Sequence, residues 1–299
     1  PEAALRPAGG LFTHTDRPRT AMPPQTVARK PARLLPFFAT LAASIAGLAE
    51  SQAAGPDFSL GLHLVHHRVE ERAANGAHLL TETGWTPMLV ARLTQPLPLG
   101  RLDAHLSWND GSLDYDGRSQ TGSRFQTTTD QRIWRTGFGY ALPIAPTLDL
   151  RARWELEDRR RHIQGRGAVA GLDERYRQHY AALGLIWTPA VAPAGTTFSA
   201  EWIAGLGGRQ TTRADGYIDP VTAPGNGVHG ARLGARIPLG AQAGNAAHRP
   251  RFALLPQLEY LHADRGETRA YRSNGVIAGS IVQPETTRWQ IGAGLEVVW

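Results

Sequence analysis

The last thirteen residues of the chain, Thr287–Trp299, read TRWQIGAGLEVVW and alternate between apolar side chains and polar or small ones. In an extended strand successive side chains point to opposite faces, so one face of this segment is apolar and the other is polar. The apolar face holds Trp289, Ile291, Ala293, Leu295, Val297 and Trp299, and the other face holds Arg288, Gln290, Gly292, Gly294 and Glu296. The segment is therefore predicted to be a strand between an apolar and a polar environment.

The same period of two occurs along most of the chain. The connections at 95–100, 143–146, 189–196 and 240–250 are short or rich in Pro, Gly and Ala, whereas the others are long and polar. Short turns at one rim and long loops at the other are typical of transmembrane barrels. The predicted strands are Phe58–Val69, Trp85–Thr94, Arg101–Asn109, Gln131–Leu142, Thr147–Glu157, Arg175–Thr188, Thr197–Arg209, Val228–Leu239, Arg251–His262 and Thr287–Trp299.

Large aromatic side chains fall on the apolar faces, mostly near strand ends, as expected for two interfacial girdles around a lipid-facing band. We therefore predict an all-β fold, an antiparallel transmembrane β-barrel of about ten strands (8–12) with long extracellular loops and short periplasmic turns. A soluble β-sandwich, which also has many alternating strands, is the alternative. The aromatics are Trp85, Trp108, Trp134, Tyr140, Trp154, Trp187, Trp202, Trp289 and Trp299.

An apolar alternation that ends on an aromatic residue resembles the closing strand of bacterial outer-membrane β-barrels. The resemblance implies that Leu295, Val297 and Trp299 belong to the signal read by the barrel assembly machinery, with periplasmic chaperones as transient partners. It also implies a Gram-negative outer-membrane location, contact with membrane lipid and lipopolysaccharide, and a monomeric state.

The first part of the chain has the order of a secretory signal peptide. Basic residues at 29–33 precede an apolar stretch, Leu34–Ala49, and small residues follow at 51–53. An apolar run of this length is shorter than the ~20 residues of a membrane-spanning helix. We expect translation to start near Met22, residues 1–53 to be leader and signal peptide, and residues 54–299 to form the barrel.

Composition excludes several classes of function. The chain has no cysteine, so a disulfide framework, a thiolate metal site and a lipoprotein anchor are ruled out. Its formal net charge of +6 includes the basic leader, and the rest shows no clustered basic patch of the kind that binds nucleic acid. We find no phosphate-binding glycine loop, zinc motif or nucleophile elbow, and predict neither cofactor nor metal.

If the apolar faces contact lipid, the opposite faces line a lumen in which positive and negative charges nearly balance. A ten-stranded interior is narrow. Paired arginines and carboxylates would mostly fill it, whereas an ion-selective porin should show an excess of one sign. The predicted lumen residues are Arg92, Arg101, Asp103, Arg135, Asp149, Arg151, Arg153, Glu155, Glu157, Glu201, Arg209, Arg232, Arg236, Glu259, Arg288 and Glu296.

Two polar segments are predicted to be loops at the outer rim. Residues 113–117 bring Asp114 and Asp116 together, and paired carboxylates can share a proton or bind a hard cation, although Asp and Gly are also common turn formers. The loop 158–175 contains the basic run Arg159–His162, which could meet lipopolysaccharide phosphates or could simply be solvated.

The two aspartates also give a weaker resemblance to omptins, the outer-membrane proteases. That family has ten strands, a pair of aspartates separated by one residue in the second outer loop, and an Asp-x-His in the fourth. Asp215 matches the fourth-loop aspartate, but Tyr217 stands where histidine is needed, and tyrosine is a poor general base at neutral pH. His262 and Asp264 could supply a substitute base.

The sequence therefore favours a non-enzymatic outer-membrane barrel with a mostly plugged, charged lumen and a surface-interaction or structural role. A narrow solute channel is the first alternative. An omptin-like protease or another surface hydrolase is the second.

Overall fold

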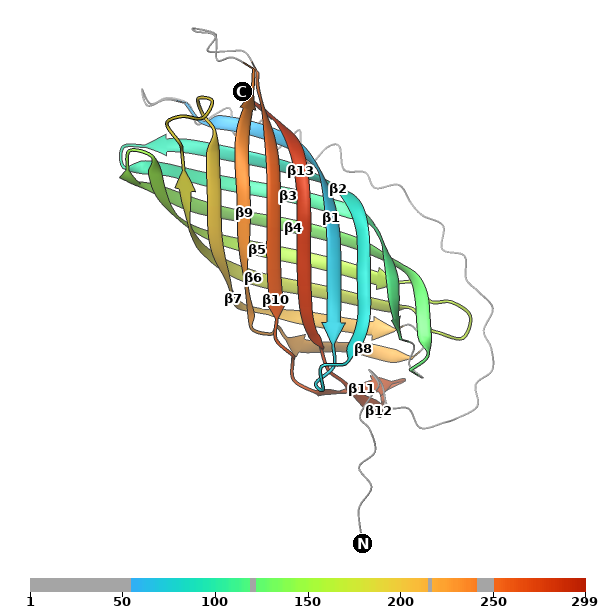
Figure 1. Cartoon of the computed structure of the whole chain (residues 1–299). Helices are drawn as coiled ribbons and strands as arrows, with labels where there is room; N and C mark the ends of the chain where they lie inside the picture. Colours follow the sequence, from blue (N-terminus) through green and yellow to red (C-terminus); the bar gives the residue numbers. More distant parts are fainter. Residues whose placement is uncertain (1–54, 119–121, 215–216, 241–249) are drawn as a thin grey trace.

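The computed structural model describes residues 55–118, 122–214, 217–240 and 250–299, and the expected leader at 1–53 lies outside them. Ten long strands form the wall, and three short ones, β8, β11 and β12, extend it at one end (Figure 1). The wall strands are β1 (Asp57–Arg72), β2 (His78–Leu97), β3 (Gly100–Arg118), β4 (Arg124–Ala145), β5 (Leu148–Ile163), β6 (Leu172–Trp187), β7 (Thr197–Ala214), β9 (Val228–Leu239), β10 (Arg251–Ala263) and β13 (Glu285–Val298). The short strands are β8 (Ile218–Pro224), β11 (Arg269–Ser273) and β12 (Val276–Ile281).

The wall is a closed antiparallel barrel of ten strands, which confirms the predicted all-β barrel and its number of strands. Neighbouring strands follow the order β6-β5-β4-β3-β2-β1-β13-β10-β9-β7, and pairing of β6 with β7 closes the ring. The first and last strands pair directly, from Ser59 opposite Val298 to Arg72 opposite Glu285. Closure leaves no edge strand, so the backbone N–H and C=O groups of every wall strand can bond to a neighbouring strand. A barrel in a membrane needs this because lipid offers the backbone no hydrogen bonds.

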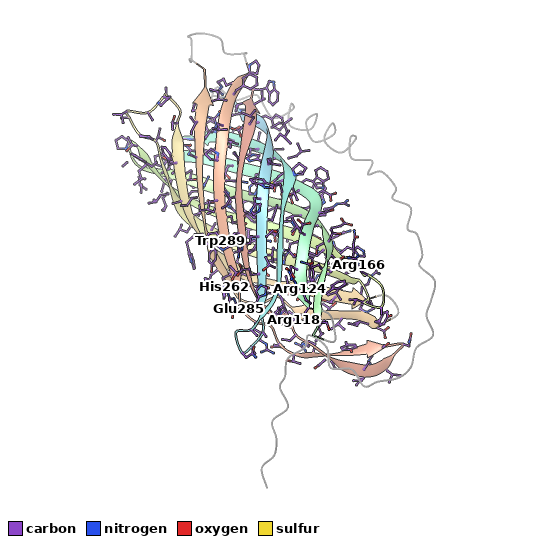
Figure 2. The ribbon with its side chains drawn as sticks, turned by 45° about the vertical axis from the view of Figure 1, so that its right-hand side comes forward. Arg118, Arg124, Arg166, His262, Glu285 and Trp289 are labelled. Atoms are coloured by element: carbon purple, nitrogen blue, oxygen red, sulfur yellow. The ribbon has the colours of Figure 1, made fainter. Side chains whose placement is uncertain are left out.

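The two rims differ in their connections. At the terminal rim, which holds Asp57 and Val298, β2 joins β3 and β4 joins β5 through two residues each. At the loop rim the connections from β7 to β9 and from β10 to β13 are the longest of the barrel, and they carry β8 and the β11–β12 hairpin, which pack together (Figure 1). In Figure 2, Trp289, His262 and Glu285 mark successive levels towards the loop rim.

The barrel is apolar outside and charged inside. Leu62 and Trp202 are about 60% exposed on the outer face, whereas Glu155 and Arg161 are almost fully buried inside. This reverses the arrangement of a soluble core and follows from the strict period of two along each strand. The aromatic residues of the predicted girdles lie on the outer face, where Trp108 contacts Trp134 and Tyr260 contacts Trp289. The described residues contain no helix long and apolar enough to cross a membrane.

Residues 113–117 and the basic run at 159–162, which were predicted to lie in loops, belong to wall strands, which corrects the sequence interpretation; of the predicted loop 158–175, residues 164–171 connect β5 to β6. β3 continues to Arg118 and β5 to Ile163, so residues 113–117 and 159–162 belong to the wall. Beyond the apolar belt the alternation persists with its polarity reversed: Leu113 and Tyr115 point inward, and Asp114 points outward. A search for apolar outward residues therefore ended these strands too early.

Arg209 was predicted inside and lies outside. The β6–β7 register shifts so that His179 faces Gly207 while Tyr180 faces Gly205, which inserts Leu206 as an extra residue. A bulge of one residue exchanges inward and outward positions beyond it. Gly207, with φ 112°, adopts the backbone that the bulge requires.

Candidate functional site

Ion pairs that span the whole lumen form its middle layer, which we define as Arg135, Arg232, Arg288, Glu155, Glu157 and Glu259. Arg135 on β4 contacts Glu259 on β10 at 2.6 Å. Arg288 on β13 contacts Glu157 on β5 through two parallel hydrogen bonds of 2.8 and 2.9 Å. In both pairs the partners are five strands apart, the largest separation that ten strands allow.

Arg232 on β9 joins Glu155 and Glu259 of this layer, and the neighbouring Glu201, into one network. Its guanidinium contacts Glu155 at 2.8 Å, Glu259 at 2.7 Å and Glu201 at 3.2 Å. Each of these carboxylates is nearly fully buried. Charge-assisted bonds of this kind are short and directional, so the network fixes side chains from opposite walls against each other.

A second layer, the loop-side layer, lies closer to the loop rim and was absent from the predicted lumen set. Arg161 contacts Glu71 at 2.9 Å, Glu82 at 2.8 Å and Glu174 at 2.7 Å. Because three carboxylates share one guanidinium, they repel one another, and burial together with this repulsion raises the pKa of Glu71 to about 7. Glu71 lies seven residues beyond Leu64, past the lipid-facing belt of β1.

Sequence reasoning missed the loop-side layer because each of its members lies beyond the predicted strand end. The sequence did contain a signal for this layer. Every second residue of β1 after His63 also points inward, namely Val65, His67, Val69 and Glu71. Following this alternation of inward and outward residues past the apolar belt, without requiring apolar residues on the outward face, would have identified the residues of the loop-side layer.

The part of the lumen next to the terminal rim is hollow, with a cavity of about 440 Å3. The charged residues around it pair mostly with near neighbours along the wall. Glu296 bonds Arg236 at 2.9 Å and Arg92 at 3.2 Å. The other contacts are Arg101 with Asp149 at 2.8 Å, Arg151 with Glu201 at 2.8 Å, and Arg153 with Asp103 at 3.7 Å.

The residues considered for proteolysis do not converge. Asp114 and Asp116 lie on the outer face of β3, and Asp116 bonds Arg124, which lowers the pKa of that carboxyl. His262 stands on β10, 3.7 Å from Asp264 and beside His229. Strands β2, β1 and β13 separate it from β3, a path of roughly 19 Å at ~4.8 Å per strand. Asp215 lies outside the described residues.

An arginine patch covers the outer wall just above the aromatic girdle. It consists of Arg160, Arg175 and Arg177, which surround the single carboxylate of Asp158 at 2.5 to 3.7 Å. Asp158 stands opposite Trp134 in the β4–β5 register, so the patch begins where the girdle ends. Arg160 faces Arg175 and Arg177 faces Arg209 across the strands, pairings that repel unless an anion lies near them.

The combination of an apolar outer belt, aromatic girdles and a charged, ion-paired lumen decides the class. The chain has the fold of an outer-membrane β-barrel. Sequence comparison adds nothing further, since no protein-family model and no curated protein matches. Solved structures with a similar fold include the outer membrane protease OmpT from Escherichia coli, with 10% identity and a TM-score of 0.49, covering 82% of this chain and 96% of that chain.

Two further solved structures are similar at lower scores. The translocator domain of the autotransporter NalP from Neisseria meningitidis has 9% identity and a TM-score of 0.42, covering 87% of this chain and 95% of that chain. The toluene transporter TodX from Pseudomonas putida has 12% identity and a TM-score of 0.32, covering 82% and 89%. What these proteins share with this chain is the barrel fold.

Proposed function

We propose that this protein is a closed, non-conducting and non-enzymatic barrel whose outer wall and loop rim, and not its lumen, carry its function. Two ion pairs that cross the full diameter of the lumen support this proposal. They join Arg135 to Glu259 and Arg288 to Glu157. Guanidinium and carboxylate groups joined at the barrel axis occupy the space that a water column would need. The protein is proposed to be monomeric.

Solute flux tests the closed lumen. Proteoliposomes containing the protein should swell in pentose or amino-acid solutions no faster than protein-free liposomes. The control is a variant with both diametric pairs truncated, Arg135→Ala with Arg288→Ala, which should admit solute if it assembles. Swelling of wild-type proteoliposomes would contradict the proposal.

A narrow solute channel is the second candidate, and the 440 Å3 cavity at the terminal rim favours it. Such a channel would need the middle layer to open. A wild-type flux that falls steeply with increasing solute size would support the channel in place of the closed barrel.

We propose that the arginine patch contacts phosphate groups of lipopolysaccharide. It lies directly above the girdle, where lipid headgroups surround a barrel, and carries three guanidinium groups for one carboxylate. Each arginine near a charged membrane surface contributes about 1 kcal/mol. Replacing all three with serine should therefore weaken lipid A binding about 100-fold.

The matched control replaces Arg68 and Arg72 with serine, since both are exposed on the loop-rim end of β1. Bis-phosphorylated lipid A, dephosphorylated lipid A and phosphatidylglycerol are compared. Equal binding of the first two lipids would refute recognition of the phosphate.

Assembly is proposed to depend on Trp299, which stacks on Phe58 at 5.9 Å and donates its backbone N–H to the Phe58 carbonyl. Trp299→Asp should abolish the heat-dependent gel shift of the folded barrel, whereas Val191→Asp, in an exposed turn at the same rim, should not. Wild-type levels of the shift in Trp299→Asp would contradict the role in the signal for the assembly machinery.

Proteolysis is expected to be absent because the acidic pair and His262 face outward on distant strands. Refolded protein with lipopolysaccharide is incubated with dibasic peptides. Cleavage that both Asp116→Asn and His262→Ala abolish would overturn the non-enzymatic proposal.

A further inference from the structure

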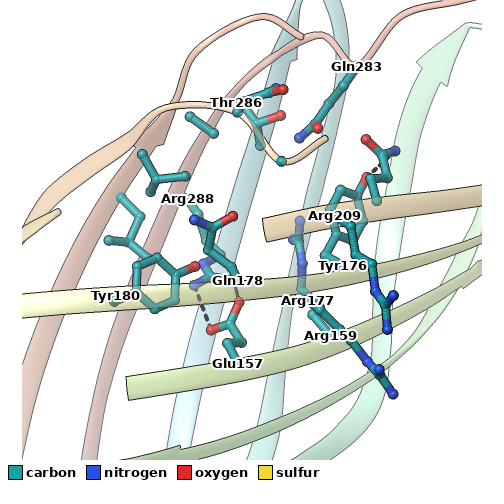
Figure 3. Close-up of a pocket in the computed structure, with 16 residues that line it drawn as sticks. Glu157, Arg159, Tyr176, Arg177, Gln178, Tyr180, Arg209, Gln283, Thr286 and Arg288 are labelled. Carbon is teal, nitrogen blue, oxygen red and sulfur yellow. Dashed lines mark hydrogen bonds and ion pairs between the residues drawn. The ribbon is translucent and has the colours of Figure 1, made fainter. Parts of the chain in front are cut away.

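A small pocket of about 50 Å3 is lined by residues of β5, β6, β7, β9, β10 and β13 (Figure 3). Its charged lining residues are mostly positive. Arg159, Arg177, Arg209 and Arg288 line it together with one carboxylate, Glu157. Glu157 already bonds Arg288 and Arg135, and Asp158 bonds Arg177, so Arg159 and Arg209 leave the pocket with an excess of positive charge.

The pocket forms where the wall changes partner. β7 pairs with β9 as far as Ala204 opposite His229, and with β8 from Arg209 opposite Pro224. The residues between them include the β7 bulge at Leu206. As a result, the inward-facing Arg159 and the outward-facing Arg177 and Arg209 line the same pocket.

Arg159 is the unusual member. Its side chain is 6% exposed, its Nε and Nη1 atoms have no hydrogen-bond partner in the part of the chain that the structure describes, and its guanidinium lies over the Tyr176 ring at 4.3 Å. Arg161, two residues further along the same face, meets three carboxylates. Burying a charge without pairing costs several kcal/mol, and buried donors are normally satisfied.

We propose that this pocket binds a small oxyanion, either phosphate or the carboxylate group of a small organic acid, on the guanidinium of Arg159. The planar donor fork of arginine matches both groups. Arg209, which has no carboxylate partner among the described residues, and Arg288 strengthen the local positive field. The volume of about 50 Å3 is that of one anion of this size.

The experiment measures the unfolding midpoint of the refolded full barrel, free of lipopolysaccharide, in phosphate, acetate and gluconate at equal ionic strength. Gluconate exceeds the pocket and serves as the reference. Phosphate or acetate should raise the wild-type midpoint with saturation, as a ligand specific for the folded state does. Titration calorimetry with phosphate and acetate then gives the two affinities and distinguishes the two sources.

Arg159→Met should lower the affinity at least ~10-fold, since hydrogen bonds to a charged group contribute about 1.5–3 kcal/mol. It should also be at least as stable as wild type in gluconate, because the variant no longer buries an unpaired charge. Arg132→Met, which removes an outward arginine of β4 that pairs with Asp110, should bind like wild type. If Arg159→Met does not assemble, Arg159→Lys should weaken binding while the barrel folds.

Either of two results would overturn the site. One is a wild-type midpoint that is identical in phosphate, acetate and gluconate. The other is undiminished phosphate binding by Arg159→Met or Arg159→Lys, which would place the anion on the outer arginines.

Discussion

The two halves of the lumen are built from the same residue types and differ in how far their charges reach. From the middle layer to the loop rim, arginines such as Arg135 and Arg161 meet carboxylates on distant strands. Near the terminal rim, Arg101 and Arg153 contact carboxylates close to them on the wall, and a cavity of about 440 Å3 remains. The number of charged residues therefore does not decide whether a lumen is closed. What decides it is whether the ion pairs cross the lumen or join nearby strands.

This difference should be visible in stability. A charge buried among several partners cannot be solvated when one partner is removed, whereas a partly exposed charge can turn to water. Substitutions in the filled half should therefore cost far more than equivalent ones in the hollow half.

Removing Arg161 should have the largest effect. Arg161→Met leaves Glu71, Glu82 and Glu174 buried together without their shared cation. We expect a loss of about 3–5 kcal/mol or failure to assemble, measured by urea unfolding in micelles and by the heat-dependent gel shift. A variant with wild-type stability would show that these carboxylates are neutralised in some other way.

Glu157→Gln should come next, because it keeps the shape but removes the charge that Arg135 and Arg288 share. Loss of charge-assisted bonds at two arginines should cost about 2–3 kcal/mol. The same unfolding measurement tests it, with Glu157→Asp distinguishing lost charge from altered geometry.

The pH dependence of stability should follow Glu71. Its folded pKa of about 7 lies above its ordinary value of 4.5, so the folded state holds the proton more tightly. The resulting stability is fully present below about pH 4.5 and is lost as pH rises through 7. Glu71→Gln should flatten this part of the profile; an unchanged profile would assign it to another group.

The smallest effect is expected in the hollow half. Arg101, 39% exposed, pairs with Asp149 beside the cavity, and Arg101→Met should change the free energy of unfolding by less than about 1 kcal/mol. A cost similar to that of Arg161→Met would remove the distinction between the two halves.

Sequence alone predicted the barrel well, because the period of two persists wherever one face meets lipid. It identified ten strands and the outward aromatics, and the lumen residues that it named, except Arg209, are brought together inside. It did not predict the bulge at Leu206, since an extra residue in a strand leaves no mark on side-chain chemistry. It also could not show that Arg159 is unpaired while Arg161 has three partners, because both are inward arginines on one strand and only the opposite wall distinguishes them.

Conductance of the purified protein in planar bilayers tests the central claim most directly. If the diametric pairs of the middle layer close the lumen, wild-type protein inserted in symmetric salt shows no steady open level. Arg135→Ala with Arg288→Ala then shows openings under the same conditions. Large, stable channels in wild type would contradict the closed barrel and establish the lumen as a conducting path.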